Sequence, residues 1–149
     1  MKKVVIGSDH AGFAVKERIK QVLEDEYEFI DVGTENEDSV DYPIYGEKVA
    51  QEVAKNPDLQ GIAVCGSGIG ISISANKVPG IRAALCYSKR AAEMSRLHNN
   101  ANVLAIAGRE KMMDDPVDIA KTFLDTEFSN EERHARRVEQ MMEIERHTS

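Results

Sequence analysis

Long apolar runs are missing from this sequence of 149 residues. The longest, such as residues 62–65 and 103–107, fall far short of the roughly 18 residues that a membrane-spanning helix needs. The apolar stretch at residues 4–6 is likewise too short for a secretory signal, whose apolar segment takes about 7–15 residues. We therefore expect no membrane-spanning helix and a location in the cytoplasm.

Cysteine is scarce as well. Cys65 and Cys86 are the two copies, too few for a disulfide framework and without the spacing of a metal site. We expect both to be free thiols in a reducing compartment. Each is then either a small buried side chain, the usual role of a free cysteine, or a reactive group.

Positive charge is in deficit, with 19 lysines and arginines against 26 acidic residues and a net charge of −7 at pH 7. This balance argues against the broad basic surface that nucleic acid or an anionic membrane requires. Any anionic ligand must therefore be small and locally bound. One region departs from the trend, because the last 17 residues hold four of the nine arginines and no lysine.

Proline is also infrequent, at four copies, whereas 42% of the residues are hydrophobic and 30% are charged. This is the composition of a folded chain. At this length, folding buries roughly 70% of the unfolded surface, enough for one core. Because the sequence has no repeat, linker or low-complexity segment, we expect a single domain over residues 1–149.

Short β-branched segments alternate with longer stretches whose apolar residues recur at helical spacing. This alternation predicts βα units around a parallel sheet, an α/β fold. The predicted strands are residues 3–7, 28–32, 61–65, 81–85 and 102–107. The predicted helices are residues 15–23, 45–54, a segment from about 70, 88–97, 118–124 and 131–146.

Polar side chains and glycines come in the connections between these strands and helices. In open α/β sheets, ligands bind in the crevice outside the carboxyl ends of the strands. The residues that we expect to meet in that crevice are Asp9, His10, residues 65–70, His98, Asn99 and Arg109. A loop histidine is often only a solvated turn residue, and an asparagine-rich loop only a turn, so each has a simpler interpretation when taken alone.

Residues 65–70, with the sequence Cys-Gly-Ser-Gly-Ile-Gly, form the densest motif. Three glycines in five residues leave backbone N–H groups accessible, and the N-terminus of the next helix adds partial positive charge, so the loop favours phosphate or an enediolate. A dinucleotide-binding loop is the obvious alternative, but Ile71 stands where that motif needs glycine, and no acidic residue ends the following strand. The lysine of a nucleotide-hydrolysing loop is also missing, since Ser72 follows Ile71.

Cys65 ends an apolar strand, and packing is the simplest explanation for it. Its place beside an amide-lined loop and a helix N-terminus nevertheless favours a thiolate. Cys86 has no such surroundings, so we expect it to pack. The histidines lack companions at zinc-like spacing, which argues against a metal site.

Arg133 and Arg137 lie four residues apart on the predicted last helix, and therefore on one face. Neighbouring glutamates offer them ordinary ion pairs. However, an apolar stripe that includes Met141 lies beside them, which suits a helix that docks on a surface and presents guanidinium groups to an oxyanion. Packing on a second subunit is a plausible use, and it would place the arginines at a shared site.

With these motifs in place, the sequence resembles the ribose/galactose isomerase family, and within it the type B ribose-5-phosphate isomerases. The resemblance covers nearly the whole chain. The residues that carry it are 7–13, 32–34, 41–43, 65–70 continuing to 75–77, 79–83, His98-Asn99 with 102–104, Gly108-Arg109, and Arg133 with Arg137. One branch of the family uses a glutamate six residues after the cysteine; here that position is Ile71, so the cysteine branch fits.

The resemblance implies a Rossmann-like three-layer αβα sandwich with a five-stranded, mainly parallel sheet. It also implies a homodimer whose C-terminal helix docks on the partner subunit, with a tetramer left open. The activity implied is metal-free and cofactor-free interconversion of D-ribose 5-phosphate and D-ribulose 5-phosphate through an enediolate, in the pentose phosphate pathway. A hexose 6-phosphate isomerase acting on allose or galactose 6-phosphate is the nearest alternative. A phosphate- or nucleotide-sensing module without catalysis is the alternative from another class.

The resemblance also implies residue roles. Cys65 matches the base that moves the proton between C1 and C2, Ser67 its activating hydroxyl, and His98 the group that opens the sugar ring. Substrate-binding positions are Asp9 and Asn99 for sugar hydroxyls, Tyr42 for the pocket wall, the amides of Gly66, Gly68, Ile69 and Gly70 for the anion hole, and His10, Arg109, Arg133 and Arg137 for the phosphate. The last two arginines are implied to reach in from the partner chain.

Overall fold

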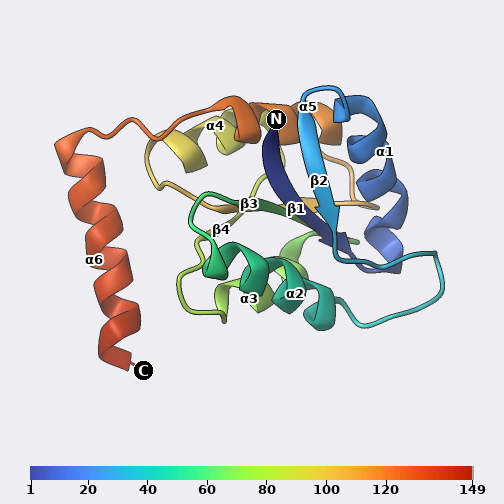
Figure 1. Ribbon diagram of the computed structural model, residues 1–149, viewed down its shortest axis with the longest axis horizontal. Coiled ribbons are helices and arrows are strands. Elements are labelled where there is room, and N and C mark those ends of the chain that lie inside the picture. The colour runs from blue at the N-terminus through green and yellow to red at the C-terminus, as the bar shows by residue number, and fades with distance from the viewer. Residues whose placement is uncertain (149) are drawn as a thin grey trace.

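The computed structural model describes residues 1–148 and shows helices on both faces of a central sheet (Figure 1). The sheet has five strands in the order β2-β1-β3-β5-β4. The strands are β1 (Lys2–Ser8), β2 (Tyr27–Asp31), β3 (Gln60–Cys65), β4 (Ala83–Leu85) and β5 (Val103–Ala107). The helices are the short 3₁₀ helix η1 (His10–Gly12), α1 (Phe13–Leu23), α2 (Tyr42–Lys55), α3 (Ile69–Asn76), α4 (Lys89–Leu97), α5 (Pro116–Asp125) and α6 (Glu132–Thr148). Ser149, the last residue of the predicted domain, lies outside this description.

All four strand pairings are parallel, so the predicted α/β sandwich with a parallel sheet is confirmed. The strand predicted at 81–85 begins only at Ala83, because the N–H of Arg82 donates to the side chain of Asn102 (2.8 Å) instead of to another strand. Helix α2 begins at Tyr42, earlier than predicted, with Pro43 in its first turn, where the fixed φ of proline favours a helix start.

Apolar side chains alternate between the two faces of the sheet. Val4 and Ile6 pack with residues of α1, α4 and α5, whereas Val5 packs with residues of α2 and α3. Figure 1 shows the same division, with α2 and α3 on one side of the sheet. Strands β3 and β5 are buried along their whole length, as expected for parallel strands covered on both faces.

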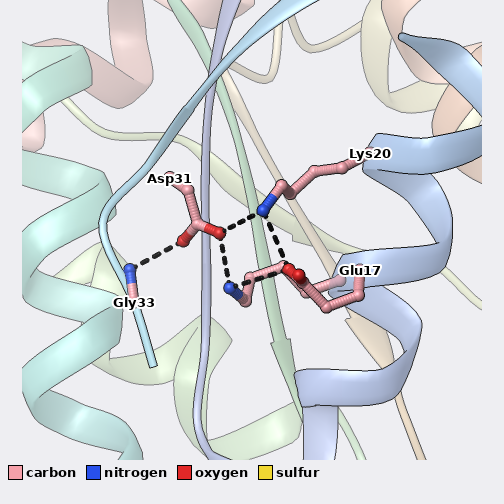
Figure 2. Close-up of polar contacts among 5 residues, drawn as sticks. Glu17, Lys20, Asp31 and Gly33 are labelled. Atoms are coloured by element: carbon pink, nitrogen blue, oxygen red, sulfur yellow. Dashed lines mark hydrogen bonds and ion pairs between the residues drawn. The ribbon is translucent and has the colours of Figure 1, made fainter. Parts of the chain in front are cut away.

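A charged cluster links α1 to the turn after β2 (Figure 2). The side chain of Lys16 is only 1% exposed, and its Nζ lies 2.6 Å from Oδ2 of Asp31, an oxygen that Lys20 Nζ also approaches to 2.7 Å. The other oxygen of Asp31 accepts the N–H of Gly33 at 2.8 Å. Burial alone would raise the pKa of Asp31, but the hydrogen bonds from both lysines and Gly33 lower it overall. The ionised carboxylate therefore fixes this turn.

Helix α6 stands away from the sandwich (Figure 1). Its Glu145 carboxylate accepts the N–H of Gly80 at 2.9 and 3.1 Å, and a guanidinium nitrogen of Arg82 lies 3.4 Å from the sulfur of Met142. A groove of about 670 Å³ lies between α6 and the β4 edge of the sheet. Ile144 on α6 is 65% exposed, so apolar surface of this helix stays open to solvent in the single chain.

Candidate active site

Three strands deliver polar residues to one edge of the sheet. Cys65, the last residue of β3, is paired with Ala107, the last residue of β5, and Ser8 at the end of β1 is paired with Val64. Asp9 and Arg109 therefore follow their strands at the level where Cys65 ends its own. The residues that follow β1, β3 and β5 therefore lie at one edge of the sheet, as the predicted crevice requires.

The loop after Cys65 is held close against the sheet. Gly68 has a φ of +80°, and a Cβ there would lie 2.8 Å from the carbonyl carbon of Ile106, so this position needs glycine. A Cβ on Gly70 would lie 2.5 Å from the ring of Tyr42. The close approach of Tyr42 and Gly70 places this tyrosine, predicted to line the pocket, against the loop.

Most amide groups of this loop are free to bind a ligand. Ile69 N donates to Ser67 Oγ at 3.1 Å. Within residues 1–148, the amides of Gly66, Ser67, Gly68 and Gly70 donate no hydrogen bond. Four neighbouring donors without a protein acceptor in this range, at the start of α3, are what the predicted anion-binding loop requires, and we call them the amide cradle. The Ile69 amide, predicted to belong to it, is instead occupied by the Ser67 side chain.

Because Ser67 Oγ accepts from Ile69 N, its own hydrogen is still available. That hydrogen can be donated to a thiolate or to a substrate oxygen. The same bond fixes the orientation of the Ser67 side chain at the start of α3, two residues after Cys65. This geometry is compatible with the activating role that the resemblance implies.

The two cysteines have different surroundings. Cys65 is 4% exposed and packs with apolar residues of α2 and α3, but it lies at the end of β3, next to the half-buried Gly66 and Ser67. Cys86 is 2% exposed, and burial raises the pKa of its thiol to about 11. Cys86 is therefore an uncharged thiol at neutral pH, as its predicted packing role requires.

The residues after β1 are locally ordered. Asp9 is 5% exposed and its Oδ1 accepts the N–H of Gly12 at 3.0 Å, which caps η1. His10 Nδ1 accepts the N–H of Val40 at 3.1 Å. An accepting Nδ1 carries no proton, so the hydrogen of the neutral ring lies on Nε2. His10 can thus donate from Nε2 to a phosphate oxygen, as predicted for a phosphate-binding position.

His98 and Asn99 do not join this crevice within one chain. They follow α4, which returns across the sheet, and they precede β5, which begins at Val103; Cys65 lies level with the opposite end of β5, at Ala107. The expectation that both residues meet Cys65 at one sheet edge of the same chain is therefore wrong. Both residues come directly before β5. In a parallel sheet, the start of a strand lies at the opposite edge from the strand ends that hold Cys65 and Arg109.

The arginines of α6 also lie far along the chain from the loop. The Arg133 guanidinium is 58% exposed and lies 3.8 Å from Glu131, while Arg136 pairs with Glu132 at 2.6 Å. Arg137 makes no ion pair within residues 1–148. Its guanidinium is thus available to a ligand, whereas the neighbouring Arg136 is already neutralised.

The described part of the chain contains neither a candidate metal site nor a candidate membrane-spanning helix. Across residues 1–148, no group of three or more His, Cys, Asp or Glu side chains could hold a metal ion. None of the helices in that range is long and apolar enough to cross a membrane.

The protein family described as Ribose/Galactose Isomerase matches residues 4–141 of the chain. The chain belongs to this family. The E. coli (strain K12) protein named ribose-5-phosphate isomerase B is 41% identical over 146 residues, which cover 97% of each chain. The resemblance stated from the sequence motifs is therefore confirmed.

Solved structures of the ribose/galactose isomerase family confirm the fold. Ribose-5-phosphate isomerase B of Clostridium thermocellum superposes with a TM-score of 0.93 at 50% identity, covering 99% of both chains. The Mycoplasma genitalium ribose-5-phosphate isomerase B, solved with bound ribulose-5-phosphate, gives a TM-score of 0.91 at 36% identity, covering 97% of this chain and 96% of that one. The Rossmann-like sandwich is thus shared with enzymes of this family.

Two residues near the predicted site residues were missed. The ring of His134 on α6 stacks on His98, with centroids 4.2 Å apart. The hydroxyl of Tyr87 donates to the carbonyl oxygen of Ser67. His134 could have been noticed as the neighbour of Arg133 on the last helix, but nothing in the sequence around Tyr87 connects it with the glycine loop.

Proposed function

We propose that this member of the ribose/galactose isomerase family interconverts D-ribose 5-phosphate and D-ribulose 5-phosphate by proton transfer, without a metal or cofactor. The observation that carries the proposal is the cradle of four unoccupied amides, Gly66, Ser67, Gly68 and Gly70, directly after Cys65. The relatives named ribose-5-phosphate isomerase B, one of them solved with ribulose-5-phosphate, support this choice of substrate. The reaction belongs in the pentose phosphate pathway of the cytoplasm.

The chemistry needs a base next to a carbonyl and donors for the charge that develops. Cys65 as thiolate takes the proton from C2 of the aldose and returns it to C1, while the hydroxyl proton passes from O2 to O1. Ser67 donates a hydrogen bond to the sulfur. Loss of one preorganised donor to a developing oxyanion costs about 2.7–4 kcal/mol in comparable sites, so several aligned amides supply a large part of the rate. Positioned acid–base catalysis adds roughly 10²–10⁴-fold.

Cys65 is buried, although a catalytic base must reach the substrate. A thiol that is 4% exposed fits a packing role as well as a catalytic one. Its terminal position on β3, followed at once by the amide cradle, favours the catalytic role, because the sulfur then lies next to the donors that would bind the enediolate. A water-excluded sulfur also protects an enediolate from side reactions.

The second half of the site comes, in this proposal, from another copy of the chain. His98, Asn99, Arg133 and Arg137 belong to the region around the end of α4 and the start of α6, and Cys65 lies at the opposite end of β5. One subunit alone therefore cannot bring them to its own Cys65. A homodimer in which α6 docks on the partner would let one subunit's ring-opening histidine and arginines complete the other's site.

Phosphate binding then draws on both subunits. His10 and Arg109 follow β1 and β5 of the subunit that holds Cys65, whereas Arg133 and Arg137 come from its partner. Asp9 and Asn99 are left to hold sugar hydroxyls. Since the phosphate is bound equally in substrate and transition state, these residues act chiefly on KM.

The direct test is turnover of ribose 5-phosphate by the wild-type chain after treatment with EDTA, with allose and galactose 6-phosphates offered in parallel. We expect ribose 5-phosphate to be preferred, Cys65→Ala to lose at least about 10³-fold in kcat, and inorganic phosphate to inhibit the wild type competitively. Cys86→Ala is the matched control and should retain turnover. An active Cys65→Ala variant would favour a different base, and a wild type that binds phosphate but isomerises none of the three sugars would favour a sensing module.

A further inference from the structure

The Ser67–Gly68 peptide lies at the centre of the amide cradle, and its orientation is held by a side chain. The carbonyl oxygens of Cys65 and Gly66 are bound by backbone donors from the end of β5: Gly108 N at 2.8 Å, and Arg109 N and Glu110 N at 3.0 and 3.1 Å. The next carbonyl, that of Ser67, accepts instead from the hydroxyl of Tyr87.

The backbone at Tyr87 is itself held in place. This residue comes two positions after the end of β4, its backbone oxygen accepts the N–H of Met113 at 2.9 Å, and Ser88 behind it caps α4. Burial, followed by the charges of Glu110 and Cys65, raises the pKa of the Tyr87 phenol. The hydroxyl is therefore protonated at neutral pH and able to donate.

The planar Ser67–Gly68 peptide links the Tyr87 contact to the direction of the Gly68 N–H. In a trans peptide the C=O of one residue and the N–H of the next point in opposite directions. A Ser67 carbonyl turned toward Tyr87 therefore turns the Gly68 N–H away from it. Within residues 1–148 that N–H has no acceptor, although Gly68 is buried. A buried, unpaired donor is costly to leave without a partner, so a ligand oxygen is its natural acceptor.

The same peptide is easy to flip. Gly68 has a φ of +80°, and glycine adopts positive and negative φ with similar ease. Rotation of the Ser67–Gly68 plane would turn a carbonyl oxygen, which repels an anion, toward the space that the N–H now faces. Something must therefore hold this plane, and the backbone donors that hold the two preceding carbonyls do not reach it.

We propose that Tyr87 is a positioning residue that holds the Ser67 carbonyl and thereby aims the Gly68 N–H at the oxyanion of the enediolate. The inference rests on the proposed isomerase function and adds a residue to it. Tyr87 does not touch the reacting atoms in this proposal; it acts through one peptide plane. Its hydroxyl should matter for the transition state and little for the phosphate group.

The test compares Tyr87→Phe, which removes only the hydroxyl, with Tyr27→Phe. Tyr27 is a matched control because its hydroxyl also makes a hydrogen bond, to Asp125, at the end of the sheet away from the loop. Thermal melts verify that both variants fold. For Tyr87→Phe we expect kcat to fall about tenfold with KM nearly unchanged, less than the roughly 10²–10³-fold loss of an entire oxyanion donor. Tyr27→Phe should keep the wild-type kcat.

Two inhibitors make the test independent of turnover. A phosphorylated sugar-acid hydroxamate mimics the enediolate oxygens, and inorganic phosphate occupies only the phosphate end. Tyr87→Phe should bind the hydroxamate about tenfold more weakly, as a misdirected oxyanion donor predicts, and inorganic phosphate as the wild type does. Equal losses for both inhibitors, or an unchanged kcat, would overturn the role of Tyr87 while leaving the isomerase function standing. A wild type without ribose 5-phosphate isomerase activity would instead overturn the function itself.

Discussion

The imidazole rings of His98 and His134 are stacked, with their centroids 4.2 Å apart and their planes 15° apart. His98 caps the C-terminus of α4, and His134 is a 6% exposed residue of α6. The contact joins the proposed ring-opening histidine to the helix that carries Arg133 and Arg137. Burial, with further contributions from the charges of His98 and Arg133, lowers the pKa of His134. The stack therefore contains a neutral His134 ring at neutral pH.

Replacing His134 should disturb the placement of α6 relative to His98. His134→Ala removes the stacked ring, and we expect several-fold lower kcat/KM for ribose 5-phosphate because the arginines are less well placed. His134→Phe keeps a flat ring that can stack, and it should retain most of the activity. Steady-state kinetics of both variants check this. Equal damage from Ala and Phe would show that the imidazole nitrogens, and not the stack, are needed.

The sign of the pH effect follows from the lowered pKa of His134. At pH values between the lowered pKa of His134 in the folded chain and its ordinary pKa in the unfolded chain, the unfolded chain binds one proton more than the folded chain. The contribution of this contact to stability is thus complete above the usual histidine pKa of about 6.5, and it is lost as the pH falls toward the lowered value. Thermal melts between pH 5 and 8 should show a smaller pH dependence for His134→Phe than for the wild type.

A shared site has a strict consequence for mixtures of two variants that are each impaired at low concentrations of ribose 5-phosphate. In a mixed dimer of Cys65→Ala and Arg137→Ala chains, one site carries both defects and the other carries neither. Random exchange should therefore restore about a quarter of all sites, since half of the dimers are mixed and each has one intact site out of two. Activity measured after subunit exchange checks this number.

The matched control combines Cys65→Ala with Ser67→Ala. Both positions belong to the same loop of the same chain, so every site in the mixture keeps one defect, and no activity should return. Recovery in both mixtures would point to reactivation by some other route. Recovery in neither, with exchange verified by a tagged subunit, would place Arg137 in the same site as the Cys65 of its own chain.

Asp31 should make a large contribution to stability. Removing its charge with Asp31→Asn leaves Lys16, 1% exposed, with only the partly exposed Glu17 at 3.2 Å. Breaking a buried ion pair from one side costs about 3–5 kcal/mol, and the 25% exposure of Asp31 reduces this to about 2–4 kcal/mol. Urea unfolding measures the difference. Lys121→Gln, which breaks a surface pair with Glu26, is the control and should cost less than about 1 kcal/mol.

The contribution of Asp31 also has a defined pH window. Because its folded pKa lies below the ordinary aspartate value of about 3.9, its stabilisation is complete above that value and is lost as the pH falls toward the folded pKa. The gap in unfolding free energy between wild type and Asp31→Asn should therefore narrow below about pH 4. A gap that stays constant down to pH 2 would assign the effect of the substitution to packing.

The sequence predicted the sheet because its signals are local. Buried parallel strands such as β3 and β5 are continuous apolar runs, and the glycines after β3 mark the loop directly. The placement of His98 was not predictable in this way. Its loop is as polar as those at the carboxyl edge, and only the direction in which α4 crosses the sheet decides at which end it lies. Tyr87 depends on a contact across 20 positions, which no local pattern encodes.

Ring opening gives the sharpest test of the role of His98. Ribose 5-phosphate is mostly cyclic, whereas ribulose 5-phosphate is open, so His98→Asn should slow the forward reaction far more than the reverse. The forward rate of this variant should also stop rising as more enzyme is added, because spontaneous ring opening then supplies the open sugar. The wild-type rate should stay proportional to enzyme concentration over the same range. If His98→Asn slows both directions equally and its forward rate remains proportional to enzyme, the histidine serves the proton transfer or binding and does not open the ring.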